Sequence, residues 1–281
     1  MQQIKAYAKL NLFLQLIGKR PDGYHLLESA IVFTDICDTL TLTPSSHVSL
    51  TITGSHADRL EIQDNLVLRA AQALISHVKN PTLAVAITLD KHIPLGAGLG
   101  GGSADAAAIL QGLNQYWGLQ LPENVLGSIG QTLGADIPVC LYGKSALVSG
   151  VGEQIAPLVM NQTMHMLLVN PNQILSTADV FKRHSLPWSK PLSEPVKSQV
   201  MSYITALRND LTDAAISFIP EIQTIMTQLL RQPGCKLARM SGSGATCFGW
   251  FENQIALDMA ADTLMRQYPD WWVRGCQVVG R

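Results

Sequence analysis

Residues 94–109 read PLGAGLGGGSADAAAI, and this stretch decides the fold. Within seven positions it holds five glycines: Gly96, Gly98, Gly100, Gly101 and Gly102. Glycine is costly to order and fills no core, so this density needs a physical reason. Residues 83–94 predict a strand that ends at Pro94, and residues 103–114 predict a helix with Ser103 near its start. A glycine loop that enters a helix N-terminus offers unpaired N–H groups to an anion.

Several kinds of site share such a loop. Gly96-x-Gly98-x-x-Gly101 formally matches the dinucleotide fingerprint, but that fold also needs an acidic residue ending a strand about 20 residues further on. Residues 121–123 read LPE at the start of a helix instead. A Walker A loop would need a Lys-Ser/Thr pair after the glycines, and a protein-kinase loop lies between two strands. A tight strand-to-helix connection without a ligand stays possible, but phosphate binding is favoured.

Three further stretches carry polar side chains or small residues in a suggestive order. Residues 4–15 alternate with period two and place Lys9 and Asn11 on one face of a strand, about 7 Å apart by the strand rise. GADIP (134–138) places Asp136 directly after a predicted helix over 125–133 that ends at Gly134. The SGSG turn (241–244) links predicted strands. Taken alone, each stretch also has a plain structural explanation. Lys9 and Asn11 would be solvated residues of an exposed edge strand, Asp136 would start a turn, and SGSG would be a hairpin loop.

Other segments give a mixed pattern of helices and strands. Strands are predicted over 29–43, 47–53, 164–171, 235–241, 245–252 and 271–279, and helices over 65–78, from 221, and over 254–267. Residues 185–198 read as a loop with three prolines. Because no regular βαβα alternation runs through the chain, the pattern favours an α+β fold over a doubly wound sheet.

Composition limits the class of protein. A chain of 281 residues, 47% hydrophobic, suggests two domains, which we place at 1–155 and 156–281. The net charge of −1 without a basic cluster argues against nucleic acid. Five scattered cysteines without a C-x-x-C pair argue against a disulfide framework or a zinc site, and favour a reducing cytoplasm. No apolar run reaches the ~18 residues of a membrane span. We expect a soluble monomer or weak homodimer without membrane partners.

Taken together and in this order, the motifs resemble the GHMP kinases. The family's central motif, P-x-x-x-G-L-G-[SG]-S-[SA]-A, is similar to PLGAGLGGGSADAA, and its C-terminal glycine-rich turn is similar to MSGSGATCF (240–248). The matching blocks run from residue 8 to about 250: AKLNLFLQLIGKRPDGYH, DNLVLRAA, PLGAGLGGGSADAA, LGADIPV, GVGE, NDL and MSGSGATC. K-x-N combined with P-D-G-Y-H points to the branch that phosphorylates a methylerythritol alcohol carrying cytidine diphosphate.

The resemblance implies a fold and a reaction. The fold would combine a ribosomal-protein-S5-like N-terminal domain with a ferredoxin-like C-terminal domain, with the active site in the cleft between them. ATP would donate its γ-phosphoryl group, with Mg²⁺ held mostly by phosphates and water. The resemblance implies Asp136 as the base for the acceptor hydroxyl, Lys9 beside it to offset charge on the moving phosphoryl group, and Asn11 to orient the substrate.

Binding roles follow from the same resemblance. The glycine loop would cradle the triphosphate, with Asn65 and Lys91 toward the adenosine end. The implied loop contacts are Pro94, Leu95, Gly96, Ala97, Gly98, Leu99, Gly100, Gly101, Gly102, Ser103 and Ala104. Tyr24, His25 and Phe181 would hold the cytosine, with Thr177 as a weaker neighbour. Ala104 departs from the family pattern, because many members have a second serine there, so any hydroxyl contact falls to Ser103.

Three competing functions stay open on the sequence alone. The chain could be a GHMP kinase that acts on another small alcohol, such as mevalonate or homoserine. It could be a nucleotide sensor without activity, although Lys9 and Asp136 together speak against that. The third is a dinucleotide-dependent oxidoreductase, which the formal glycine fingerprint leaves open.

Overall fold

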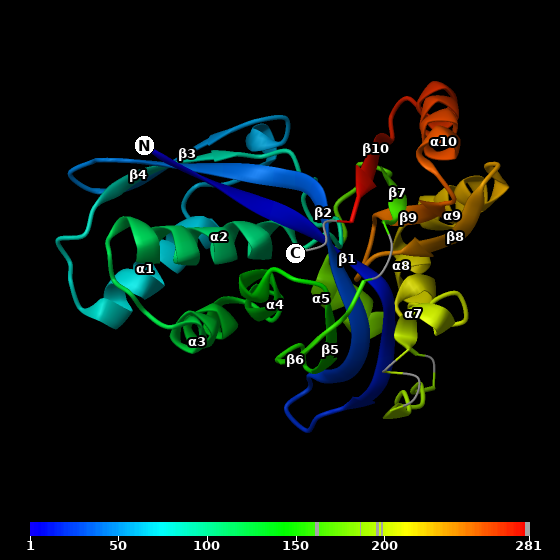
Figure 1. The fold of residues 1–281 in the computed structure, drawn as a ribbon, viewed down its shortest axis with the longest axis horizontal. Coiled ribbons are helices and arrows are strands. Elements are labelled where there is room, and N and C mark those ends of the chain that lie inside the picture. Colours follow the sequence, from blue (N-terminus) through cyan, green and yellow to red (C-terminus); the bar gives the residue numbers. More distant parts are fainter. Residues whose placement is uncertain (161–162, 186, 195–196, 198, 279–281) are drawn as a thin grey trace. The chain divides into compact units, whose positions relative to one another are not determined.

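The computed structural model describes residues 1–160, 163–185, 187–194, 197 and 199–278 (Figure 1). The chain forms two compact units, and each is assembled from separate segments. The first unit takes Met1–Lys9, Ile36–Leu95 and Gly100–Gly143, and the second takes Leu10–Asp35, Gly96–Leu99 and the chain from Lys144 onward. The division into two contiguous domains at residue 155 stays a proposal.

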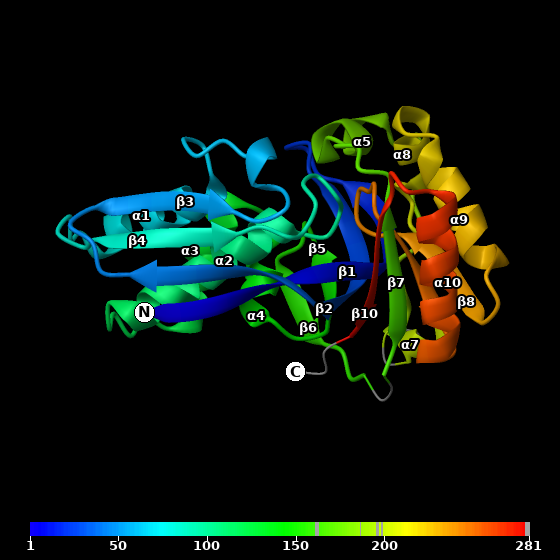
Figure 2. The same ribbon diagram turned by 90° about the horizontal axis from the view of Figure 1, so that it is seen from above.

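The first unit is a sheet with helices packed on one face. Its strands are β3 (Val48–Thr53), β4 (Val85–Asp90) and the second half of β2 (His25–Thr43). β3 runs parallel to β4, and β2 pairs antiparallel with β4 from Thr39 opposite Asp90 to Thr43 opposite Ala86. β1 (Gln2–Lys19) pairs with β2. Helices α1 (Leu66–Val78), α2 (Gly101–Tyr116) and α3 (Glu123–Leu133) cover one face (Figure 2).

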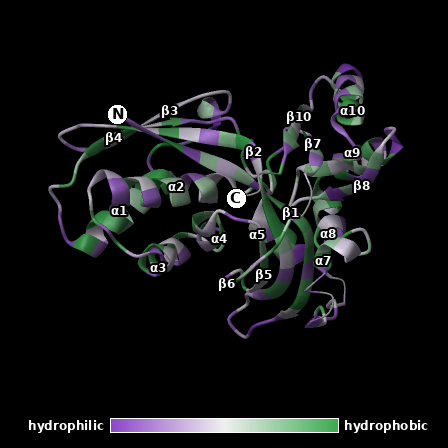
Figure 3. Cartoon of the chain, viewed as in Figure 1, coloured by the Kyte–Doolittle hydropathy of each residue, from purple (hydrophilic) through white to green (hydrophobic). Residues whose placement is uncertain are grey.

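The core of this unit explains why these segments fold together. Apolar side chains from alternate positions of the strands meet the apolar faces of the three helices, among them Leu40, Ile87, Leu74, Leu110 and Leu126. Helix α1 shows hydrophobic and hydrophilic residues along its ribbon, as an amphipathic helix requires (Figure 3). A short 3₁₀ turn η1 (Ala57–Arg59) and helix α4 (Ile137–Tyr142) complete the unit.

The second unit holds a four-stranded antiparallel sheet in the order β10-β7-β9-β8. Its strands are β7 (His165–Asn170), β8 (Cys235–Met240), β9 (Cys247–Phe251) and β10 (Trp272–Gln277). Helices α9 (Glu221–Arg231) and α10 (Gln254–Gln267) bury their apolar faces against it. Numbered within the unit this is order 4-1-3-2, with helices before the second and fourth strands, which is the β-α-β-β-α-β arrangement of ferredoxin-like domains.

Further elements of the second unit lie outside that sheet. The first half of β2 pairs with β5 (Ala146–Gly150), and β5 pairs with β6 (Gln154–Pro157). Three short helices are α5 (Thr177–Arg183), α7 (Val200–Tyr203) and α8 (Thr212–Phe218). None of these three was predicted. The predicted loop over 185–198 and the end of the predicted strand 271–279 lie partly outside the described residues.

Several predicted boundaries need correction. Helix α2 begins at Gly101 instead of Ser103, because Gly100 at φ +64° turns the chain directly into the helix. Asp136 is the cap residue of α4, a helix that was not predicted. Gly134 ends α3 in an extended conformation, so the left-handed glycine cap expected there is found instead at Gly143, after α4.

Candidate active site

In the first unit, the exit of the glycine loop lies against two lysine side chains. A Cβ atom at Gly100 would come within 2.7 Å of Lys9 Cγ. A Cβ at Gly101 would lie 3.0 Å from Ile93 Cγ2 and 3.1 Å from Lys91 Nζ. These close approaches, together with the positive φ of Gly100, explain why the helix starts with glycines. The first N–H groups of α2 have no intrahelical acceptor, so this end of the helix can bind an anion.

Lys9 and Asp136 form the predicted pair. Lys9 Nζ lies 3.2 Å from Asp136 Oδ2, with the lysine side chain 5% exposed and the aspartate side chain 43% exposed. Asp136 makes no capping hydrogen bond with its side chain, although its carbonyl accepts the N–H of Cys140. The carboxylate is therefore directed to Lys9 instead of its own helix. A buried cation beside an accessible carboxylate suits proton removal from an alcohol.

Lys91 lies in a buried cluster with two carboxylates. Its Nζ is 2.5 Å from Asp38 Oδ2 and 2.6 Å from Asp105 Oδ2, and all three side chains are buried. Burial lowers the pKa of Lys91, but the two carboxylates outweigh burial and raise it overall. Burial raises the pKa of Asp105 to about 7, with Lys91 acting in the opposite direction and Asp38 adding to the rise. Sequence reasoning missed both aspartates.

Asn65 caps a helix. Its Oδ1 accepts the N–H of Val67 at 2.9 Å, which satisfies one of the unpaired donors at the start of α1. The DNLVLRAA block thus has a local structural reason for its asparagine. Contacts of Asn65 and Lys91 with adenosine stay predictions.

In the second unit, the glycine loop, β1 and the SGSG turn are bonded to one another. Ser241 Oγ donates to Gly98 O at 3.0 Å, and the N–H of Thr246 donates to Ala97 O at 3.1 Å. The N–H of Asn11 donates to Ser241 Oγ at 3.1 Å. The structure thus brings together three of the stretches that the sequence singled out. A side chain at Gly98 would collide with the backbone of the turn.

Asn209 is a residue of this region that sequence reasoning missed. Its Nδ2 donates to Met240 O at 2.8 Å and to Gly242 O at 2.7 Å, and these two bonds help to fix the turn. Asn11 is held in turn by Ser29, whose Oγ accepts from Asn11 Nδ2 at 2.8 Å. In the sequence, Asn209 stands out only as the first residue of the NDL block. A buried side-chain amide needs hydrogen-bond partners, and here those partners are the carbonyl groups of the turn.

Two of the three residues predicted for the cytosine, His25 and Phe181, lie in an aromatic cluster. The rings of His25 and Phe181 are 5.2 Å apart, and His184 and Trp188 also contact the His25 ring. Burial lowers the pKa of His25, and Lys19 and His184 add to this. Tyr24 is 61% exposed. The sequence pointed to His25 and Phe181 and missed His184 and Trp188.

Thr177 starts helix α5 beside the SGSG turn. Its Oγ1 lies 2.8 Å from Ser243 Oγ, so the two hydroxyls share a hydrogen bond. The residue predicted as a weak neighbour of the substrate is thereby linked to the turn that also holds Asn11.

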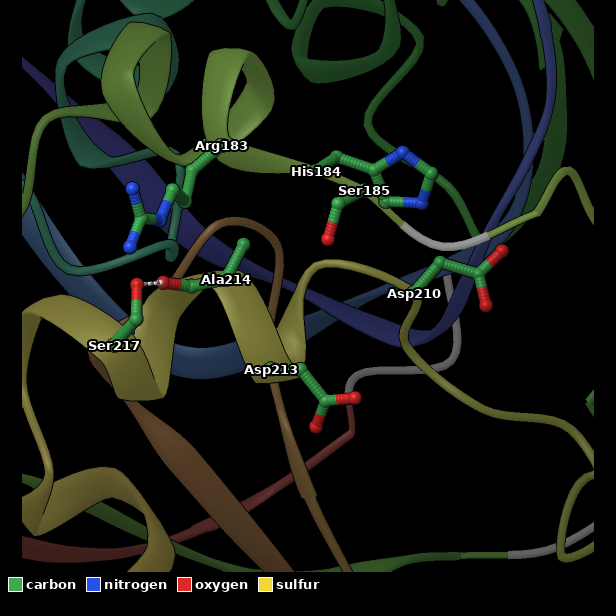
Figure 4. A pocket seen from close by; sticks show the side chains of 7 residues that line it. All are labelled: Arg183, His184, Ser185, Asp210, Asp213, Ala214 and Ser217. Carbon is green, nitrogen blue, oxygen red and sulfur yellow. Dashed lines mark hydrogen bonds between the residues drawn. The ribbon is translucent and has the colours of Figure 1, made fainter.

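A cavity of about 150 Å³ lies beside α5 and α8. Its lining residues are Arg183, His184, Ser185, Asp210, Asp213, Ala214 and Ser217 (Figure 4). Figure 4 shows Asp213 and Ser217 on α8 below the segment that carries Arg183 and His184, with Ser217 Oγ bonded to Ala214 O. None of the residues predicted for the site lines this cavity.

The described residues were also compared with the requirements of a metal site and of a membrane-spanning helix. Within the ranges given above, no group of three or more His, Cys, Asp or Glu side chains is arranged to hold a metal ion. In the same part of the chain, no helix is both long and apolar enough to cross a membrane.

Comparison with known proteins adds to this geometry. The family model described as "GHMP kinases N terminal domain" matches residues 65–144, and the model "GHMP kinases C terminal" matches residues 198–270. A protein from Cereibacter sphaeroides named 4-diphosphocytidyl-2-C-methyl-D-erythritol kinase is 42% identical over the full length of both chains.

Solved structures agree with this in fold. A crystal structure titled 4-(cytidine 5'-diphospho)-2C-methyl-D-erythritol kinase superposes with a TM-score of 0.82 at 30% identity, covering 99% of this chain and 100% of that chain. The structure of L. major mevalonate kinase in complex with R-mevalonate gives a TM-score of 0.71 at 15% identity, covering 100% of this chain and 96% of that chain. The second likeness shows the fold alone. The predicted α+β two-domain fold is confirmed.

Proposed function

We propose that this chain, which belongs to the GHMP kinase family, phosphorylates 4-diphosphocytidyl-2-C-methyl-D-erythritol with ATP. The acceptor is the 2-hydroxyl of the methylerythritol unit, in non-mevalonate isoprenoid precursor biosynthesis. The observation that carries the proposal is identity of 42% over the full length to a protein with that name. The Lys9–Asp136 ion pair supports it, because a nucleotide sensor without activity has no need of a base and a cation together.

Asp136 acts as the general base in this proposal. Its carboxylate is accessible, so the acceptor hydroxyl can approach it. The carboxylate accepts the hydroxyl proton as the oxygen attacks the γ-phosphorus, the bond from that phosphorus to the β,γ-bridging oxygen breaks, and ADP leaves. Lys9 is fixed by burial of its stem and lies within 3.2 Å of that carboxylate. Its ammonium offsets negative charge on the transferring group, where a preorganised cation costs no reorganisation.

The nucleotide is held by backbone groups at the start of α2. The left-handed Gly100 opens the helix, and the N–H groups that follow it present the positive end of the helix dipole to phosphates. Mg²⁺ would neutralise charge on the phosphates and align them. A magnesium ion typically keeps waters and phosphate ligands, so a loop of backbone donors fits it. Ser103 supplies a hydroxyl in the first turn of α2.

The cytidine end is assigned to the aromatic cluster. Phe181 and His25 offer ring faces, and the exposed Tyr24 adds a third ring at the turn between β1 and β2. Asn11 and Thr177, both bonded to the SGSG turn, orient the substrate. A nucleoside recognised by stacking distinguishes this substrate from mevalonate and homoserine, which have no ring.

A substrate panel tests the proposal. Purified protein with ATP and Mg²⁺ is assayed with the cytidylated alcohol, mevalonate and homoserine. We expect kcat/KM for the cytidylated alcohol to exceed that for either of the two smaller alcohols by about 100-fold or more, because unpaired polar groups in the site penalise substrates without the nucleoside. Phosphorus NMR then shows which hydroxyl carries the new phosphate. Faster turnover of mevalonate or homoserine would reassign the substrate.

A nucleotide sensor and an oxidoreductase would each give a distinct result in binding experiments. ATP binding without turnover of any alcohol would favour a nucleotide sensor. NAD binding in a fluorescence titration would favour an oxidoreductase, and we expect none.

A further inference from the structure

Three charged side chains lie in the core of the first unit without a part in the proposed chemistry. Lys91, Asp38 and Asp105 are 1%, 0% and 2% exposed. Bringing charges out of water is costly, and a well-packed apolar set of similar volume is often as stable as a buried ion cluster. Packing alone therefore does not explain this cluster. Its partners do.

Asp38 holds the segment that leads into the glycine loop. Its Oδ1 accepts the N–H of His92 at 2.5 Å and of Ile93 at 2.9 Å, while Oδ2 binds Lys91. These amides lie within two residues of Pro94, where the loop begins. One carboxylate on β2 thus fixes both the backbone and the lysine of the loop's entry.

Asp105 holds the segment that leaves the loop. It lies near the start of α2, and its Oδ2 is 2.6 Å from the same ammonium. The ammonium also lies close to the first residue of the helix: a Cβ atom at Gly101 would be 3.1 Å from Lys91 Nζ. The second carboxylate oxygen, Asp105 Oδ1, is buried without a hydrogen-bond partner among the described residues. The ion pair of Asp105 with Lys91 is therefore made through Oδ2.

We infer that Lys91, Asp38 and Asp105 are positioning residues. Together they hold the segment that enters the glycine loop and the segment that leaves it in a fixed arrangement. This role rests on the proposed function of the loop in binding ATP. A loop rich in glycine has many conformations to lose on binding a ligand. Fixing its two ends in advance lowers that loss, so the cluster raises affinity for the nucleotide without contributing a group to the reaction.

The test compares Lys91→Met with Lys5→Met. Both remove an ammonium from the same unit, but Lys5 is exposed on β1. The dissociation constant of ADP with Mg²⁺ is measured by calorimetry, together with KM for ATP, KM for the alcohol and kcat. We expect Lys91→Met to raise the ADP dissociation constant and KM for ATP about tenfold or more, because a small displacement of the glycine loop weakens its contacts with the nucleotide. KM for the alcohol should stay unchanged. Lys5→Met should alter none of these constants.

A second readout needs no nucleotide. Hydrogen exchange of the amides of residues 104–106 in the unliganded protein is expected to be faster in Lys91→Met than in the wild type, because the start of α2 loses its anchor. Lys91→Arg keeps a buried cation and should recover part of the ADP affinity. If Lys91→Met does not fold, Asp38→Asn replaces it, since it keeps an acceptor for the two amides and removes the charge that faces Lys91.

The outcomes separate the two proposals. A folded Lys91→Met protein with lower thermal stability but unchanged ADP affinity and exchange would overturn the positioning role. If the wild type binds ADP and does not phosphorylate the cytidylated alcohol, the proposed substrate fails while the positioning role is still decided by binding and exchange. Absence of ADP binding in the wild type would overturn both.

Discussion

The carboxylate of Asp136 lies at a helix start where an aspartate usually bonds to its own backbone, yet it faces Lys9. We expect Asp136→Asn to lower kcat by about 10²-fold or more, because the amide cannot accept the hydroxyl proton. Affinity for ATP should change little, since the side chain serves the acceptor. Steady-state kinetics and calorimetry measure the two effects. Asp262→Asn, an exposed aspartate on α10, is the matched control. Full activity in Asp136→Asn would remove Asp136 from the role of base.

Asp105 gives the stability of the chain a specific dependence on pH. Burial raises the pKa of Asp105 from 3.8 to about 7. The nearby Lys91 ammonium lowers this pKa, and the Asp38 carboxylate raises it further. Between these values the folded chain binds a proton that the unfolded chain has released, so the free energy of unfolding falls as pH rises through this window. Burial lowers the pKa of Lys91, but Asp105 and Asp38 raise it overall, so Lys91 stays protonated through this window and does not contribute there. The thiol of Cys140, whose pKa is raised by burial and then by Asp136, also stays protonated.

Replacing Asp105 by asparagine tests this dependence. Asp105→Asn keeps an oxygen for Lys91 and removes the titration, so we expect a flatter profile of unfolding free energy between about pH 4 and about pH 7. Urea unfolding at a series of pH values measures the profile. An unchanged slope would mean that the proton is bound elsewhere.

The residues of the site could be predicted only where local sequence carries them. Lys9, Asp136 and the glycines stand in short motifs, and the structure brings Lys9 to Asp136 although 127 positions separate them. Asp38 and Asp105 could not be predicted as members of one cluster, because their shared partner Lys91 lies 53 and 14 positions away along the chain. One signal was present: a charged residue in the alanine-rich start of α2 must find a partner if that helix is buried.

At the scale of the element, the join of Gly100 to α2 determines the geometry of the loop exit. Gly100→Ala would place a methyl group at φ +64° and within 2.7 Å of Lys9 Cγ. We expect it to weaken ATP binding and to lower the free energy of unfolding by about 1 kcal/mol or more, the usual cost of a strained left-handed residue. Calorimetry and urea unfolding measure both. ATP affinity equal to that of the wild type would show that the loop tolerates this shift.

Gly127→Ala is the control for this change. Gly127 lies within α3, and a Cβ atom there would meet nothing within 4 Å. Alanine is the better helix former, so this variant should gain roughly 0.5–1 kcal/mol. The two glycine variants are expected to move stability in opposite directions.

Elements were predictable in proportion to their length and periodicity. The helices over 65–78 and 254–267 and the strands around them carry strong patterns, and the structure contains them. Helices α5 and α8 have seven residues each, too few for a periodic signal. They form because Val180, Ala214 and Ala215 are buried in the second core, and such tertiary packing cannot be read from a short segment.

At the scale of the whole molecule, each unit has its own core but shares its longest strands with the other. Leu74→Ala in the first core and Leu229→Ala in the second each empty a fully buried position, and each should cost about 2–5 kcal/mol. Because β1 and β2 supply residues to both units, we expect each variant to shift one common unfolding transition. Hydrogen exchange of α2 and α9 during urea unfolding measures this. Two separate midpoints would show that the units unfold independently.

The interleaving of the segments has a consequence for how this gene can be divided or recombined. The second unit takes residues 10–35 and 96–99 from the midst of the segments that build the first. A single crossover with a related gene, wherever it falls inside these segments, therefore joins halves of two ancestries within one sheet or one core. A truncated product ending at residue 143 would include 30 residues of the second unit, but the rest of that unit begins only at Lys144. Exchange of either unit with a related gene would therefore require several coordinated cuts.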